Sequence, residues 1–232
     1  MVKITIQKEV FQKIPDLKIA FFHLTNADNQ KNIKESKILI EETAQLVRLL
    51  YHKDSIRTHH LISPWELARL DMKNKMVPMH SAVEHFFSMA LHSQKVSINS
   101  SAENILRHIL FRHIVPGSTD DLDKIQGDIT FKLAKKNQKL SWFTQLSKND
   151  LIYKDQSNTN PYIGAKLDFA KSPRTRTSKY SKNILLHLDF LPIISPSKQR
   201  QIITETKNLL EAFTDAKVKT AILTQNKNTH SF

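Results

Sequence analysis

Residues 100–134 read SSAENILRHILFRHIVPGSTDDLDKIQGDITFKLA and carry the strongest local signals for the fold. Ser100 begins an S-x-x-E capping box, and apolar residues then recur at helical spacing. The sequence therefore predicts a helix over 101–114 that Pro116-Gly117 ends. Residues 129–134 alternate between apolar and polar side chains, which predicts a strand.

Outside this stretch, helix and strand patterns are mixed without strict alternation. Strand patterns cover 2–6, 17–24, 184–191 and 217–223, and helix patterns cover 33–51, 81–92 and 195–216, with another helix start at Ser63-Pro64. Residues 135–182 are irregular, and we expect short strands and long loops there. This order predicts an α+β fold of mixed or antiparallel sheets flanked by helices. We expect one domain over 1–225 and a disordered tail over 226–232.

The composition excludes several classes of protein. The chain has no Cys, which excludes disulfide scaffolds, Cys-ligated zinc and thiol catalysis. It has only three Gly and no glycine-rich phosphate loop, and its eleven His have no metal-ligand spacing. We therefore expect no cofactor, nucleotide or metal. There is no signal-peptide pattern and no apolar run long enough to span a membrane, so we expect a cytoplasmic protein without a membrane partner.

Positive charge is concentrated in one part of the chain. The formal net charge is +13, and residues 132–200 contain 14 Lys and Arg but only 4 Asp and no Glu. This stretch thus accounts for ten of the thirteen net charges. Such a basic region indicates a polyanionic partner, with nucleic acid first and an anionic membrane second. An ordinary solvated basic surface is the other interpretation.

The densest basic segment contains Arg174, Arg176, Lys179 and Lys182. In an extended chain the two arginines project to the same side. That spacing would allow them to contact successive phosphates of a nucleic acid, and we assign all four residues to RNA binding. A solvated loop is the alternative.

An acidic run, Asp120-Asp121-Leu122-Asp123, interrupts this basic chain. Carboxylates at this spacing are compatible with a divalent metal. They are more typical of a turn in which Asp side chains accept hydrogen bonds from backbone N–H groups. We favour the turn and expect Asp121, Asp123 and Gly127 to stabilise it.

Several short motifs occur in the order found in one known family. Residues 121–129 read DLDKIQGDI, which resembles the D-L-D-K-I-x-G-D-I motif of the B3/B4 domain family. His80-Ser81-Ala82-Val83-Glu84 is similar to its R-S-S-V-E, and Ser97-Ile98-Asn99 is similar to its S-I-N. Arg174-Thr175 and Lys182-Asn183 resemble its R-T and K-N. The similarity spans roughly residues 2–225, and it implies the fold of the family's module in the β subunit of phenylalanyl-tRNA synthetase.

The resemblance also implies an activity, which is hydrolysis of a misacylated tRNA. A pocket built for phenylalanine cannot strongly reject an added hydroxyl, so a second, hydrolytic site is needed. Positioning a water against a labile ester requires no nucleophilic residue. By this resemblance Ser81, Glu84, Asn99 and Ser118 would line the editing pocket. Ser118 stands where the synthetase module has a His within P-x-H-A-F-D.

Three functions agree with these observations. The first is a tRNA-binding protein that receives the acceptor end and hydrolyses a misacylated ester in trans. The second is a non-catalytic RNA-binding protein with the same fold and basic face. The third is a binder of a small, amino-acid-like ligand that makes no use of RNA.

Overall fold

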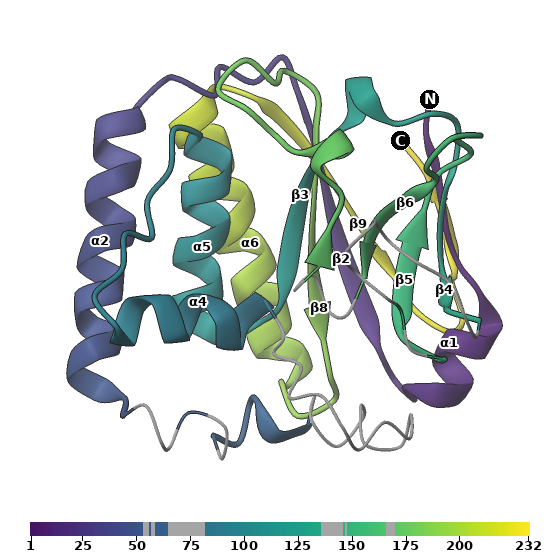
Figure 1. Ribbon diagram of the computed structural model, residues 1–232, viewed down its shortest axis with the longest axis horizontal. Coiled ribbons are helices and arrows are strands. Elements are labelled where there is room, and N and C mark those ends of the chain that lie inside the picture. Colours follow the sequence, from purple (N-terminus) through teal and green to yellow (C-terminus); the bar gives the residue numbers. More distant parts are fainter. Residues whose placement is uncertain (53–55, 57–58, 65–81, 136–145, 147, 166–169) are drawn as a thin grey trace.

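A computed structural model describes residues 1–52, 56, 59–64, 82–135, 146, 148–165 and 170–232 (Figure 1). The helices in this part are α1 (Lys8–Lys13), α2 (Ile33–Leu50), α4 (Ala82–Leu91), α5 (Ser101–His113) and α6 (Pro196–Thr214), with 3-10 turns η2 (Leu122–Lys124) and η3 (Pro173–Thr175). The strands are β1 (Lys3–Ile6), β2 (Lys18–Thr25), β3 (Gly117–Asp121), β4 (Ile129–Leu133), β5 (Leu151–Lys154), β6 (Tyr162–Ala165), β7 (Ala170–Lys171), β8 (Ile184–Phe190), β9 (Lys217–Leu223) and β10 (Thr229–Ser231).

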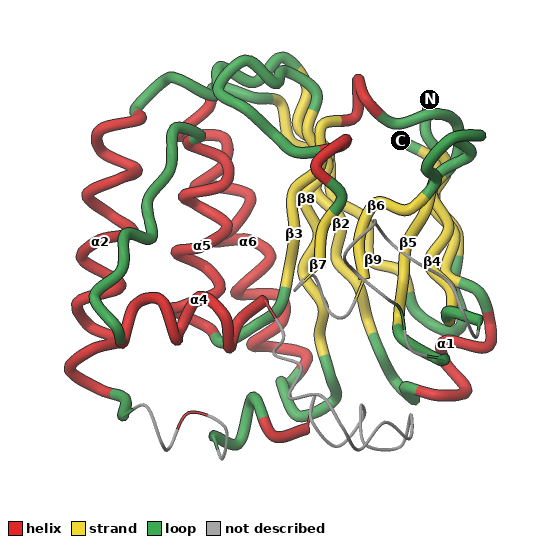
Figure 2. The backbone as a smooth tube through the Cα atoms, in the orientation of Figure 1, coloured by secondary structure: helices red, strands yellow, loops and turns green. Residues whose placement is uncertain are grey.

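These elements form three layers, which Figure 2 shows from left to right as helices, one sheet and a second sheet. The middle sheet is antiparallel with strand order β3-β8-β2-β9. The outer sheet has the order β10-β1-β4-β5-β6-β7 and is mixed, because β1 and β4 pair in parallel. Helices α2, α4, α5 and α6 lie on the free face of the middle sheet (Figure 1). The predicted α+β class, with two sheets flanked by helices, is confirmed.

Strand β8 shows why the layers form. All seven of its residues are buried, since it lies inside the middle sheet with a layer on each face. Ile184, Leu186 and Leu188 point to the helices, whereas Leu185 points to the outer sheet. The core between the sheets also includes Ile4, Ile6, Ile19, Phe21, Ile129, Phe131 and Tyr153. Burial on both faces supplies the main stabilisation, at roughly 25 cal/mol per Å² of apolar surface.

Helix α5 forms as predicted, but its two ends differ from the prediction. Ser100 Oγ accepts a hydrogen bond from Glu103 N at 3.3 Å, so half of the capping box exists. The Glu103 carboxylate does not complete the box, because it bonds Arg107 and Thr177 instead. The helix ends at Ile114 in the left-handed region with φ 53°. The Pro-Gly pair that we expected to end the helix leads into a strand.

That strand, β3, was expected to be part of a turn. Gly117 begins it, and a Cβ at this position would lie 2.4 Å from the carbonyl oxygen of His187 on β8. A glycine therefore permits the close approach of the two strands. The favoured turn interpretation is correct for the residues that follow. Asp121 accepts from Asp123 N at the start of η2, and Gly127 takes φ 70°.

The C-terminal residues form part of the outer sheet, so the expected disordered tail over 226–232 is wrong. Strand β10 pairs with β1 in the register Lys3↔Ser231. Phe232 exchanges backbone hydrogen bonds with Val2, and its ring packs against the core between the sheets. Backbone pairing and apolar burial together hold this end of the chain.

The helix that we expected to begin at Ser63-Pro64 lies largely outside the described residues. Within the described part of the chain, no helix is long and apolar enough to cross a membrane.

A buried histidine joins α5 to α2. His108 Nδ1 lies 2.7 Å from Thr43 Oγ1, and that hydroxyl donates to the carbonyl of Leu39 at 2.7 Å. One hydroxyl hydrogen cannot serve both bonds, so Nδ1 of the neutral imidazole must be the donor to Thr43. Burial, assisted by nearby Arg112, lowers the pKa of His108 to about 4.

This histidine should make the protein sensitive to acid. The folded state resists protonation of His108 above pH 4, whereas the unfolded chain binds the proton near pH 6.5, so stability falls as the pH drops. The expected loss from this residue is about 3 kcal/mol between pH 7 and pH 4. Urea unfolding at pH 7 and at pH 4 measures the stability lost on acidification. This loss should be larger by that amount in the wild type than in His108→Asn, which keeps a donor toward Thr43. An equal pH dependence in the two proteins would contradict the assignment.

Candidate nucleic-acid interface

An exposed basic loop connects η3 to β8 at the upper edge of the view in Figure 1. It spans residues 176–182, and we call it the basic loop. Arg176, Lys179 and Lys182 are exposed, as is Tyr180, whose exposed fraction is 69%. The Lys179 ammonium lies 4.8 Å from the centre of the Tyr180 ring. An exposed aromatic ring among cations is the combination that binds a base and its phosphates.

The backbone of the basic loop is fixed by hydrogen bonds to the connection between β2 and α2 and to the end of β3. The carbonyl of Ser178 accepts from Asn29 Nδ2 at 2.7 Å, and the carbonyl of Lys182 accepts from Ala27 N at 2.9 Å. Ser181 Oγ donates to Asp121 Oδ2 at 2.6 Å. Because these hydrogen bonds hold Ser178, Ser181 and Lys182 in place, the exposed cations of the loop project from a defined backbone.

The segment before the loop is held by a buried polar network around Asp120. This carboxylate accepts hydrogen bonds from Thr175 Oγ1 at 2.8 Å and from the Tyr153 hydroxyl at 3.1 Å. The Lys171 ammonium lies 3.4 Å from it and also donates to the carbonyl of Thr119. Asp120 is 1% exposed, so the network lies in the interior. It ties β3 and β5 to the chain that leads into the basic loop.

Arg174 is 23% exposed and is held in an ion pair, which sets it apart from the three exposed cations that we assigned with it to RNA binding. Residues 173–175 form a 3-10 turn, so the chain is not extended and the two arginines are not side by side. The Arg174 guanidinium bonds Asp155 Oδ2 at 2.8 Å and the carbonyl of Lys124 at 2.7 Å. The Asp155 side chain is completely buried. A phosphate that bound Arg174 would have to compete with this buried carboxylate, and breaking a buried pair is costly.

The described members of the predicted pocket wall do not come together. Ser118 pairs with His187 across the strands, so strand alternation directs it to the outer sheet, where its hydroxyl lies 3.3 Å from the Tyr153 oxygen. Because Tyr153 donates its one hydrogen to Asp120, Ser118 is the donor in this contact. Glu84 lies on α4, and Asn99 accepts from Lys37 of α2 at 2.6 Å. Both therefore belong to the helical layer, on the opposite face of the middle sheet. Ser81 lies outside the described residues.

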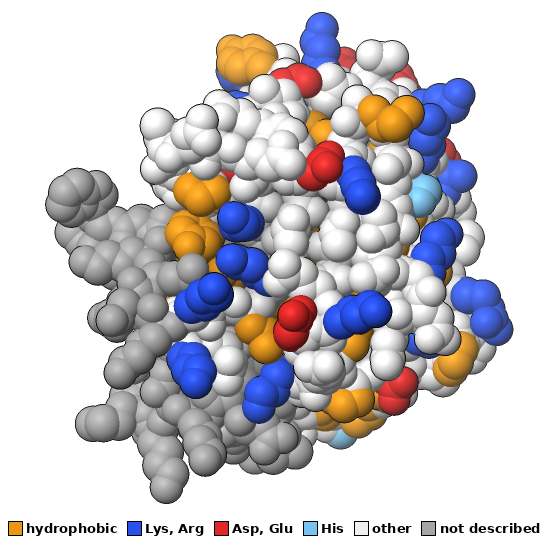
Figure 3. All heavy atoms as spheres, turned by 90° about the vertical axis from the view of Figure 1, so that its right-hand side faces the viewer, with side chains coloured by type: hydrophobic (Ala, Val, Ile, Leu, Met, Phe, Trp, Pro, Cys, Tyr) orange, Lys and Arg blue, Asp and Glu red, His pale blue; other side chains and the backbone are white. Residues whose placement is uncertain are grey.

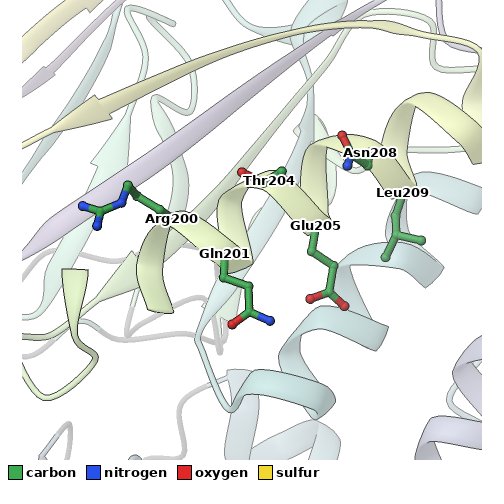
Figure 4. Close-up of a pocket in the computed structure, with 6 residues that line it drawn as sticks. All are labelled: Arg200, Gln201, Thr204, Glu205, Asn208 and Leu209. Carbon is green, nitrogen blue, oxygen red and sulfur yellow. The ribbon is translucent and has the colours of Figure 1, made fainter. Parts of the chain in front are cut away.

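A depression of about 540 Å³ lies on the outer surface of α6 (Figure 4). It is lined by Arg200, Gln201, Thr204, Glu205, Asn208 and Leu209. The Glu205 carboxylate is held by Arg112 Nε and His113 Nε2 of α5, each at 2.9 Å. Burial is the main cause that lowers the pKa of His113. These contacts join two helices, and we assign the depression no chemistry.

The part of the chain that the structure describes contains no group of three or more His, Asp or Glu side chains arranged to hold a metal ion. Tyr180 is the member of the interface that we did not predict. Its signal was present in the sequence, as an aromatic residue inside the basic run 174–182.

No model of a known protein family matches this chain, and a search of curated proteins finds no relative of it. The similarity to the B3/B4 domain family therefore depends on the short motifs of the sequence.

Proposed function

We propose that this protein binds RNA through the basic loop, and that the acceptor end of a tRNA is its first candidate ligand. The observation that carries the proposal is the exposed Tyr180 ring beside Lys179, with two more exposed cations in the same loop. Stacking on an aromatic side chain contributes about 1–3 kcal/mol per base, and the cations neutralise phosphates. The choice of tRNA rests on the resemblance of the motifs.

The loop favours RNA over an anionic membrane. Tyr180 is its only large apolar side chain, so the loop has little that could insert into a bilayer. The acceptor end of a tRNA is single-stranded, and it offers an unpaired base together with a run of phosphates.

Substitution of Tyr180 tests this assignment. Tyr180→Ala should weaken binding of a short single-stranded RNA ending in CCA by about tenfold, because the stacking surface is lost. Tyr180→Phe retains the ring and should bind like the wild type. Fluorescence anisotropy at fixed salt measures both affinities. Tyr180 has no part in RNA binding if the alanine variant retains full affinity.

Hydrolysis is tested separately from binding. Purified protein is incubated with tyrosyl-tRNA and other misacylated tRNAs, and release of the amino acid is compared with the spontaneous rate. Turnover above that rate supports editing in trans. Salt-sensitive binding without turnover supports a non-catalytic RNA-binding protein. Binding of free amino acids without affinity for RNA would contradict the proposal and favour a small-ligand binder.

A further inference from the structure

The outer face of the six-stranded sheet carries a second group of cations. Phe131 and Tyr153 point inward, so strand alternation places Thr130, Lys132 and Lys154 on the opposite, outer face. Thr130 is directly opposite Lys154 in the antiparallel pair β4–β5. Lys132 is therefore the diagonal neighbour of Lys154, at a Cα separation of about 7–8 Å.

These lysines repel each other. Burial lowers the pKa of Lys132, and the charges of Lys154 and Lys135 lower it further. Among the described residues, neither Lys132 nor Lys154 has an ion pair with a carboxylate. Figure 3 shows this side of the molecule, where Lys and Arg side chains are spread widely and Asp and Glu are few. The cluster thus holds positive charge that is not compensated by a nearby described carboxylate.

An aromatic residue borders the cluster. Tyr162 on β6 is the cross-strand partner of Lys154 and is partly exposed. Its ring packs on a small apolar group that includes Leu146, Ile152 and Ala165. These three residues are buried, so Tyr162 lies at the border between a covered and an open part of this face. Burial raises the pKa of Tyr162, so its hydroxyl stays neutral near pH 7. The face therefore combines a supported, uncharged ring with adjacent ammonium groups.

We propose that the partly exposed part of this face, formed by Lys132, Lys154 and Tyr162, binds single-stranded nucleic acid. Tyr162 would stack on a base, and Lys132 and Lys154 would contact phosphates. A β-sheet face with an aromatic ring and flanking cations suits an unpaired strand, since every base has a flat face and the backbone carries regular charge. This inference rests on the proposed function and gives the RNA a second contact surface. The chain of β6 and β7 continues through η3 into the basic loop.

The test combines Lys132→Gln with Lys154→Gln and measures RNA affinity between about 50 and 200 mM salt. Two lost phosphate contacts should reduce the slope of log K against log salt by about 1.4 for a single strand.

Thermal unfolding provides a second measurement. Removing two mutually repelling charges should leave the midpoint unchanged or raise it, so reduced affinity would not result from unfolding. The matched control is Lys34→Gln with Lys207→Gln in the helical layer, which should retain the wild-type slope.

The outcomes separate this inference from the proposed function. A lower slope for the sheet variant supports the inference, even if substitutions in the basic loop have no effect. An unchanged slope and affinity, together with loss of binding in the basic-loop variants, overturn the inference and leave the proposed function intact. No binding of RNA by the wild-type protein overturns both. Binding of the sheet face to anionic phospholipid vesicles but not to RNA also overturns the inference.

Discussion

Asp120→Ala should reduce the free energy of unfolding by about 3–5 kcal/mol, because it removes the acceptor at the centre of a buried network. Thr175 and Tyr153 each donate a hydrogen bond to this carboxylate, and the Lys171 ammonium is 3.4 Å away. The substitution leaves two hydroxyls and one ammonium without their shared partner. Each unsatisfied buried group has a cost of about 1–3 kcal/mol. Urea unfolding at pH 7 measures the loss.

The acidic run supplies its own control. Asp123 lies three residues along the chain and is exposed, with its carboxylate accepting from Asn183 at 2.8 Å. Asp123→Ala should therefore cost about 1 kcal/mol or less. Asp120→Asn keeps the shape and one acceptor oxygen but loses the charge, and we expect a result between the two alanine variants. Equal losses for both alanine variants would contradict a special role for the buried network.

The sequence predicts most of the helices and strands whose apolar residues repeat with the period of the element. Residues 184–191 were recognisable as a buried strand, and 195–216 as a helix, because their apolar spacing repeats with the period of the element. In the structure these stretches are β8 and α6, and Ser195 caps the helix by accepting from Lys198 N. Periodic burial is a local property, so it is visible in a single sequence.

Strand β3 was not predictable by the same reasoning. Its residues are Gly, Ser, Thr, Asp and Asp, all buried, and Gly and Asp in particular are depleted in strands. They are tolerated in the interior because groups 33 to 60 residues away in the sequence satisfy them, among them Tyr153, Thr175 and Ser181. Pairing over such separations leaves no local pattern. The same reason explains why Ser118 was assigned to a pocket although it faces the outer sheet.

The candidate interface was predictable as a region but not residue by residue. Arg174 and Arg176 are two positions apart and identical in chemistry, yet one is held by Asp155 and the other is exposed. The difference arises from a carboxylate whose position depends on the turn after β5. Charge density therefore located the segment, whereas tertiary contacts decided which of its cations can meet a ligand.

Reversing the charge of the basic loop should give the largest loss of RNA affinity. The variant combines Arg176→Glu, Lys179→Glu and Lys182→Glu, and we expect tRNA binding to weaken about 100-fold or more at physiological salt. Three phosphate contacts are lost, and three carboxylates then repel the RNA. All three residues are exposed, so thermal unfolding should show little change. The affinity is measured by filter binding or anisotropy across a salt series.

The two arginines of the segment provide the sharpest control for this result. Substituting one of them should lower stability, whereas substituting the other should lower RNA affinity. Arg174→Ala removes the partner of a fully buried carboxylate and should lower stability by about 3 kcal/mol, while the protein that remains folded binds RNA with nearly wild-type affinity. Arg176→Ala should leave stability unchanged and weaken RNA binding several-fold. A greater loss of RNA affinity in folded Arg174→Ala than in Arg176→Ala would contradict this assignment. It would mean that the RNA displaces the buried ion pair, and that the interface lies around Asp155 instead of the basic loop.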